Sequence, residues 1–214
     1  MKPERNDCEQ AEMELLIIRH GQSMGEVEER HEGKADFPLS PLGYEQAEKT
    51  ARFLYRNYPL ERIYSSPLLR ARSTAEMIAR PLQLQVEFVD ALNERDNGLL
   101  SGMLRTEALE KFPYPPNGRP YYESFFGGES DLEQRSRVEH FFARLCQEHP
   151  AHRIGVISHA STINMLFRSF LNLPIQVNLY LSTSEAGVHF WHLNDKFRQI
   201  IFNNYRGHLD QTAG

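Results

Sequence analysis

Short apolar segments alternate along this chain with longer segments whose apolar residues recur every three or four positions. The first short segment is "LLII" at residues 15–18, and a similar one, "RIGVIS", occupies residues 153–158. Short aliphatic runs of this kind are typical of buried strands. Strands that are separated by helices pair in parallel and are covered on both faces. The sequence therefore predicts a three-layer α/β fold, with a mainly parallel sheet between two layers of helices.

Two of the expected helices begin with the same signal, a serine followed by a proline. Ser40-Pro41 and Ser66-Pro67 each offer an N-cap side chain and a residue suited to the first helical turn. The helix at residues 131–148 is expected to bury Leu132, Val138, Phe141, Phe142 and Leu145. We expect strands at residues 14–18, 62–65, 84–89, 153–158, 187–193 and 198–202, and helices at residues 41–58, 67–82, 131–148 and 161–171.

Residues 112–128, "FPYPPNGRPYYESFFGG", differ from the rest of the chain in being rich in proline, glycine and aromatic residues. Such a segment is neither a regular helix nor a central strand. It is either a packed surface loop or a cap that covers a pocket and selects the substrate, because long loops inside compact domains are often functional. We expect a polar N-terminal tail at residues 1–13 and a single domain at residues 14–214 that includes this cap segment.

Composition narrows the class of protein. The chain has 214 residues, of which 40% are hydrophobic, and a net charge of −5, so a nucleic-acid or membrane partner is not expected. Cys8 and Cys146 cannot form a disulfide framework, and no apolar run approaches the ~20 residues that span a bilayer. These features favour a cytoplasmic enzyme.

Chemically capable side chains collect where the expected strands end. Arg19 and His20 follow the first strand, Arg70 lies in the helix after the second, and His159 follows "VIS" at residues 156–158. Glu94 comes shortly after the strand at residues 84–89. Ligands of open α/β sheets bind beyond the carboxyl ends of the strands, so we expect these residues to meet.

This set of residues suits phosphoryl transfer. A neutral imidazole can attack phosphorus and hold the group as phosphohistidine, while arginines meet the charge on the phosphoryl oxygens. A protonated His159 would add a third donor, and Glu94 could protonate the leaving alkoxide. We therefore expect a small phosphorylated substrate and neither a metal ion nor an organic cofactor.

Five segments in order extend this interpretation: "LLIIRHGQS", "YSSPLLRARSTAEMIA", "LNERDNGLLSG", "GGES" and "VISHAS". Together they resemble the signature segments of the histidine phosphatase superfamily, the phosphoglycerate-mutase-like clan, over nearly the whole chain from residue 14. The resemblance implies that His20 accepts the phosphoryl group, that Arg19, Arg70 and His159 form the phosphate pocket, and that Glu94 donates the proton. Gln22 and Ser23 fall where the family carries Glu or Gln followed by Ser or Thr, and Ala160 follows the second histidine. The resemblance thus implies three catalytic residues, His20, Glu94 and His159, and five substrate-binding residues, Arg19, Arg70, Gln22, Ser23 and Ala160.

The chain departs from the family pattern at two positions. The family often has asparagine at the position of Glu26, a contact on the phosphate side, and a carboxylate there would repel the phosphate. We therefore expect Glu26 either to turn away or to be held neutral. The family usually has glycine where this chain has Ala160, which costs little if the backbone there is not in a glycine-only conformation.

Four other functions remain alternatives to a phosphatase. A phosphoglycerate-mutase-type transferase would use the same residues but return the phosphoryl group to its substrate. Residues 21–25, "GQSMG", match the G-x-S-x-G turn of serine hydrolases, with Ser23 as the nucleophile. His31-Glu32 begins like the zinc motif H-E-x-x-H, but Ala35 occupies the second ligand position. A catalytically inactive module could bind a phosphorylated ligand, although it need not keep both His20 and Glu94.

Overall fold

A computed structural model of the chain describes residues 12–116, 118–124, 126–148, 153–177 and 179–210. Within these residues, six strands form one sheet in the order β3-β2-β4-β1-β5-β6. The strands are β1 (Met13–Arg19), β2 (Arg62–Ser65), β3 (Val86–Phe88), β4 (Arg153–Ser158), β5 (Val188–Leu193) and β6 (Arg198–Tyr205). The helices are α1 (Met24–Val27), α2 (Pro41–Asn57), α3 (Leu69–Leu82), α4 (Arg105–Lys111), α5 (Asp131–Glu148) and α6 (Ala160–Phe170), with short 3-10 helices η1 (Asp90–Leu92) and η2 (Gly98–Leu100).

The sheet is mainly parallel, as the sequence predicts. β3, β2, β4 and β1 pair in parallel, each with its neighbour. β5 pairs antiparallel with both β1 and β6. The last two strands are joined by residues 194–197 alone, and so short a connection allows only an antiparallel hairpin.

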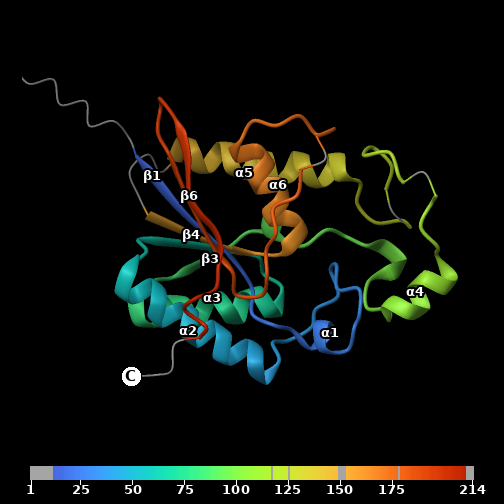
Figure 1. Cartoon of the computed structure of the whole chain (residues 1–214), viewed down its shortest axis with the longest axis horizontal. Helices are drawn as coiled ribbons and strands as arrows, with labels where there is room; N and C mark the ends of the chain where they lie inside the picture. Colours follow the sequence, from blue (N-terminus) through green and yellow to red (C-terminus); the bar gives the residue numbers. More distant parts are fainter. Residues whose placement is uncertain (1–11, 117, 125, 149–152, 178, 211–214) are drawn as a thin grey trace, which may run out of the picture.

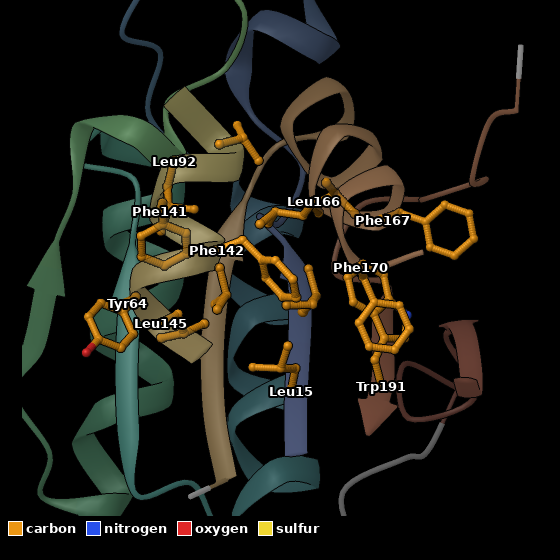
Figure 2. Close-up of a cluster of buried hydrophobic side chains, with 14 of the residues drawn as sticks. Leu15, Tyr64, Leu92, Phe141, Phe142, Leu145, Leu166, Phe167, Phe170 and Trp191 are labelled. Atoms are coloured by element: carbon orange, nitrogen blue, oxygen red, sulfur yellow. The ribbon is translucent and has the colours of Figure 1, made fainter. Parts of the chain in front are cut away.

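Both faces of the sheet are covered, which explains the uninterrupted apolar run in β1. Leu15 and Ile17 point into a core formed with α5 and α6. Leu16 and Ile18 point into the opposite core, formed with α2 and α3. Figure 1 shows these two helix pairs on opposite sides of the sheet. Figure 2 shows the first core, in which Phe142, Phe170 and Trp191 pack beside Leu15.

The predicted helices agree closely with the structure, except at the start of α3. Ser40 caps α2 and accepts a hydrogen bond from the Gly43 N–H at 3.0 Å, as expected. The prediction that Ser66 caps the next helix is wrong, because α3 begins at Leu69 after a residue that makes no side-chain cap. The Ser66 hydroxyl instead bonds to two side chains that follow β3 and β4, as described below.

Two smaller predictions also need correction. Leu132 is 47% exposed rather than buried, because the first turn of α5 extends past the core toward the cap segment, where the Leu132 N–H bonds to Tyr121 O. Residues 1–11 of the expected tail lie outside the described residues, but Met13 belongs to β1 and is 2% exposed. It pairs with Leu193 of β5, so the strand begins one residue earlier than predicted.

The expected cap segment has no helix or strand among its described residues, as predicted. It follows α4, a short helix that the sequence pattern does not predict. Figure 1 places α4 and this segment at the end of the sheet where α1 lies. The Arg105 N–H donates to Glu29 O and the His31 N–H donates to Met103 O, so the segment before the cap is tied to the residues that follow α1.

Candidate active site

The predicted site residues lie at the carboxyl ends of three neighbouring parallel strands. Arg19 at the end of β1 is in register with Ser158 at the end of β4, and Ser65 of β2 pairs with Ile157. The next residues along the chain, His20, Ser66 and His159, are therefore brought together. The rings of His20 and His159 lie 5.0 Å apart between their centroids.

His20 is buried and its tautomer is fixed by the backbone. Its Nδ1 lies 2.7 Å from Gly21 O. A carbonyl oxygen only accepts hydrogen bonds, so Nδ1 carries the proton and Nε2 of the neutral ring keeps its lone pair. Burial lowers the pKa of His20 well below its usual value, and the charges of Arg70 and Arg19 lower it further. The ring is thus held in its neutral form, with the Nε2 lone pair free of a proton.

His159 is held by the hydroxyl of Ser66. Ser66 Oγ donates to Asn93 Oδ1 at 2.7 Å, so it accepts from His159 Nε2 at 2.8 Å. This leaves Nδ1 of His159 buried and without a hydrogen-bond partner among the described residues. Burial lowers the pKa of His159, as do Arg70, the His20 ring and Arg19. The expected protonated ring therefore needs a negative charge nearby to offset these cations.

Arg70 is fully buried, because the loop after α1 wraps its guanidinium. Its two terminal nitrogens donate to Ala35 O and Gly33 O, each at 2.9 Å. Its Nε lies 3.4 Å from the Glu32 carboxylate but makes no hydrogen bond. Burial lowers the pKa of Arg70, whereas the Glu32 and Glu94 carboxylates raise it.

The two terminal nitrogens of Arg19 are held by hydrogen bonds. Its Nη1 donates to Thr183 O at 2.9 Å and its Nη2 to Glu26 Oε1 at 2.8 Å. A second carboxylate, that of Glu185, lies 3.8 Å from the same Nη2. Glu26 therefore does not turn away from Arg19, which is predicted to bind the phosphate, but forms an ion pair with this arginine.

Three buried nitrogens on these residues have no hydrogen-bond partner among the described residues: Arg19 Nε, Arg70 Nε and His159 Nδ1. A buried polar group without a partner costs about 1–3 kcal/mol, so three on residues that surround one imidazole indicate a place for a ligand rich in acceptor oxygens. The charges of both arginines act on both histidines, so the four side chains lie near one another. This arrangement can bind a tetrahedral oxyanion.

Glu94 lies beside the start of α6, which follows His159. Its Oε1 accepts from the Arg95 N–H at 2.8 Å and its Oε2 from the Ser161 N–H at 3.3 Å, in the first turn of α6. Arg137 of α5 steadies the loop, because it donates to Ala91 O and Glu94 O and forms a two-point ion pair with Glu129. The "GGES" segment thus supports the loop that carries Glu94.

Gln22 and Ser23 make scaffold contacts. The Gln22 amide oxygen accepts from Ser40 Oγ at 2.8 Å. Ser23 Oγ donates to Glu32 at 2.5 Å and accepts from the Glu26 N–H, which caps α1. None of these partners is an imidazole, so the contacts of Ser23 in the described part of the chain give it no base of the kind a serine nucleophile uses. Substrate binding by Gln22 and Ser23 stays a prediction.

Ala160 is the first residue of α6, and its backbone is not among those with positive φ. Alanine in place of glycine is therefore tolerated here, as expected. Substrate binding by this residue is not tested by its contacts.

Glu32 and Ser66 also adjoin the site, although the sequence did not predict them there. The Glu32 side chain is 10% exposed, and burial raises its pKa although Arg70 opposes the shift. Nothing in the local pattern marks a loop carboxylate as buried, so only the fold reveals it. Glu32 contacts Ser23 and Arg70 and so supports these two side chains. This role differs from the one that a glutamate has in the zinc motif H-E-x-x-H.

Two structural findings bear on the other kinds of site. In the ranges that the structure describes, no group of three or more His, Cys, Asp or Glu side chains is arranged to hold a metal ion. In the same ranges, no helix combines the length and the apolar character that crossing a bilayer requires.

Comparison with known proteins identifies relatives of the whole fold. The model of the histidine phosphatase superfamily (branch 1) matches residues 15–204. Phosphoserine phosphatase 1 of Hydrogenobacter thermophilus is 31% identical, covering 93% of this chain and 95% of its own length. The phosphatase PhoE of Bacillus subtilis is 29% identical, covering 85% of this chain and 92% of its own. The solved structure of a mycobacterial glucosyl-3-phosphoglycerate phosphatase with VO3 superposes with a TM-score of 0.80 at 25% identity, covering 90% of this chain and 99% of that one.

Proposed function

The chain belongs to the histidine phosphatase superfamily, and from this premise we propose that it hydrolyses small phosphomonoesters through a phosphohistidine formed on His20. The observation that carries the proposal is a set of three buried nitrogens near the His20 ring, on Arg19, Arg70 and His159, that have no hydrogen-bond partner among the residues the structure describes. A phosphoryl group supplies acceptor oxygens for the N–H groups of both arginines. The negative charge would also favour the protonated form of His159, whose Nδ1 then becomes a donor.

In the first step, the Nε2 lone pair of His20 forms a bond to phosphorus while the bond between phosphorus and the ester oxygen breaks. The Gly21 carbonyl keeps the proton on Nδ1 and orients the ring for this attack. Arg19 and Arg70 offset the charge on the equatorial phosphoryl oxygens, where fixed cations are most effective. Glu94 gives its proton to the departing alkoxide, which leaves as an alcohol.

In the second step, the Glu94 carboxylate takes a proton from water as the water oxygen attacks the phosphohistidine. The bond between phosphorus and Nε2 breaks, His20 returns to its neutral form, and inorganic phosphate is the product. The acid and base roles of Glu94 thus restore each other within one cycle.

A cavity of about 280 Å³ next to the Glu94 loop is our candidate for the leaving-group pocket. Arg95 lines it and donates to Asp131 Oδ1 at 2.6 Å, with Arg119 of the cap segment 3.1 Å from the same oxygen. This size and polarity suit a compact, polar leaving group. Tyr114 and Arg119, both within residues 112–128, line this cavity. Their position supports the interpretation of this segment as a cap rather than as a packed surface loop.

The test compares p-nitrophenyl phosphate hydrolysis by wild type, His20→Ala and His140→Ala, the last a surface histidine of α5. We expect His20→Ala to lose at least about a thousandfold in kcat and His140→Ala to match wild type. Rapid quenching with labelled substrate should trap acid-labile, base-stable label on the wild-type chain. Turnover by His20→Ala at the wild-type rate, or a wild-type chain that never carries label, would contradict the proposal.

The same preparation decides the substrate class. A screen of phosphorylated metabolites for phosphate release, with His20→Ala as the blank, ranks sugar phosphates, phosphoserine, phosphoglycerate and nucleotide monoesters. Interconversion of phosphoglycerates faster than phosphate release would show a mutase instead.

A further inference from the structure

The guanidinium that the proposed function assigns to the phosphoryl group already has a carboxylate partner, Glu26. We propose that Glu26 is a specificity-determining residue, which competes with phosphate for Arg19 and so sets how tightly the site retains inorganic phosphate. This inference rests on the proposed function, because it concerns the same pocket. It goes further because it proposes that an acidic residue, Glu26, weakens the binding of the product.

The contacts of Arg19 show why the two must compete. A guanidinium binds an oxyanion through two adjacent N–H groups. One such edge contains Nη1, which donates to Thr183 O at 2.9 Å. The other edge joins Nε, which has no partner in the described part of the chain, to Nη2, which donates to Glu26 at 2.8 Å. Nη2 carries two N–H groups, so a phosphate on this edge shares Nη2 with Glu26, and two anions on one nitrogen repel each other.

Glu26 has a second partner to which it can turn. Its Oε2 lies 2.6 Å from Nη2 of Arg105, at the start of α4. If phosphate weakens the contact of Oε1 with Arg19, the carboxylate therefore keeps Arg105 as a cation and is not left unpaired. The Glu26 side chain is 20% exposed, so water can also solvate it.

The consequence differs for ester and product. The ester can gain further contacts through its leaving group, whereas inorganic phosphate depends on the arginines and histidines alone. Glu26 weakens the hold of Arg19 on both the ester and inorganic phosphate. The ester keeps the contacts of its leaving group, whereas inorganic phosphate has no other contacts that offset the loss. The expected benefit is fast product release and weak product inhibition.

The experiment measures phosphate affinity by titration calorimetry and by inhibition of p-nitrophenyl phosphate hydrolysis. We expect Glu26→Gln to bind inorganic phosphate about five- to tenfold more tightly than wild type, since a partly buried ion pair is worth about 1 kcal/mol. Glu185→Gln should show a smaller increase, because that carboxylate lies 3.8 Å from Arg19. Glu28→Gln is the matched control, because Glu28 pairs with Arg30 and should leave affinity unchanged.

Arg105→Gln separates competition from loosening of the cap. Both this variant and Glu26→Gln break the contact with α4, but Arg105→Gln leaves Glu26 with Arg19 alone and should weaken phosphate binding. Equal or weaker phosphate binding by folded Glu26→Gln, or the same direction of change in both variants, overturns the inference. Glu26→Asn serves as the second variant if the first does not fold. Calorimetry needs no turnover, so it tests Glu26 even if the wild type proves unable to hydrolyse esters.

Discussion

Arg70 and Arg19 approach the same pocket from surroundings that hold them very differently. Arg70 is fully buried, and backbone carbonyls of Gly33 and Ala35 accept its terminal N–H groups. The Arg19 side chain is 12% exposed, and one of its two bonds goes to a carboxylate that has another partner. Arg70 is thus part of the fold as well as of the site, whereas the partner of Arg19 can change. The predictions below test this difference.

The largest expected effect is that of Arg70→Ala. It leaves two buried carbonyls and the Glu32 carboxylate without their cation, so we expect a loss of about 3–5 kcal/mol in the free energy of unfolding together with loss of hydrolysis. Urea unfolding and p-nitrophenyl phosphate turnover measure the two effects. Arg72→Ala, two residues along the same helix, is the control. Wild-type stability in Arg70→Ala would remove the distinction between the two arginines.

Arg19→Gln should separate activity from stability. We expect a fall of about 10²–10³ in kcat, typical of losing one transition-state donor, with a change of only about 1 kcal/mol in unfolding free energy. The same two measurements apply. A loss of stability as large as that of Arg70→Ala would mean that both arginines are structural.

The pH dependence gives a finer test. His20 must be neutral, and its lowered pKa places the acid limb of kcat/KM below pH 6.5. The proposed acid role of Glu94 predicts in addition that the rate does not keep rising with pH. Arg19→Gln removes one cause of the lowered pKa, so the acid limb should move to higher pH. An unshifted limb, or a rate that rises steadily to about pH 9, would count against these roles.

The smallest effect is expected for Glu32→Gln. Burial raises the pKa of Glu32, so its ionised form is disfavoured in the folded chain and lowers stability as pH rises above 4.5. The variant removes this cost and can keep the bond to Ser23, so it should be as stable as wild type at pH 5 and equally or slightly more stable at pH 8. Urea unfolding at both pH values is the measurement. Clear destabilisation at pH 8 would show that the pair with Arg70 outweighs the burial of the carboxylate.

Local patterns predicted the six strands and the four longest helices, but not the short helices such as α4 and not every helix start. Residues 62–65, 131–148 and 153–158 have the predicted boundaries, because alternation and helical spacing reflect burial within one segment. Ser66 shows the limit of such reasoning. Its hydroxyl bonds to His159 and Asn93, which lie far away in sequence. These contacts determine the role of Ser66, although the proline that follows it is typical of a helix cap.

By itself the sequence determined that a parallel sheet would bring Arg19, His20, Arg70, Glu94 and His159 together, because strand ends are local features and the rule for parallel pairing is general. Only the tertiary structure decided the proton position on His20, the pairing of Glu26 with Arg19 and which nearby nitrogens lack a hydrogen bond among the described residues. These depend on the orientation of side chains in the packed fold, which no spacing along the chain encodes, since each side chain takes whichever partner the fold brings within reach.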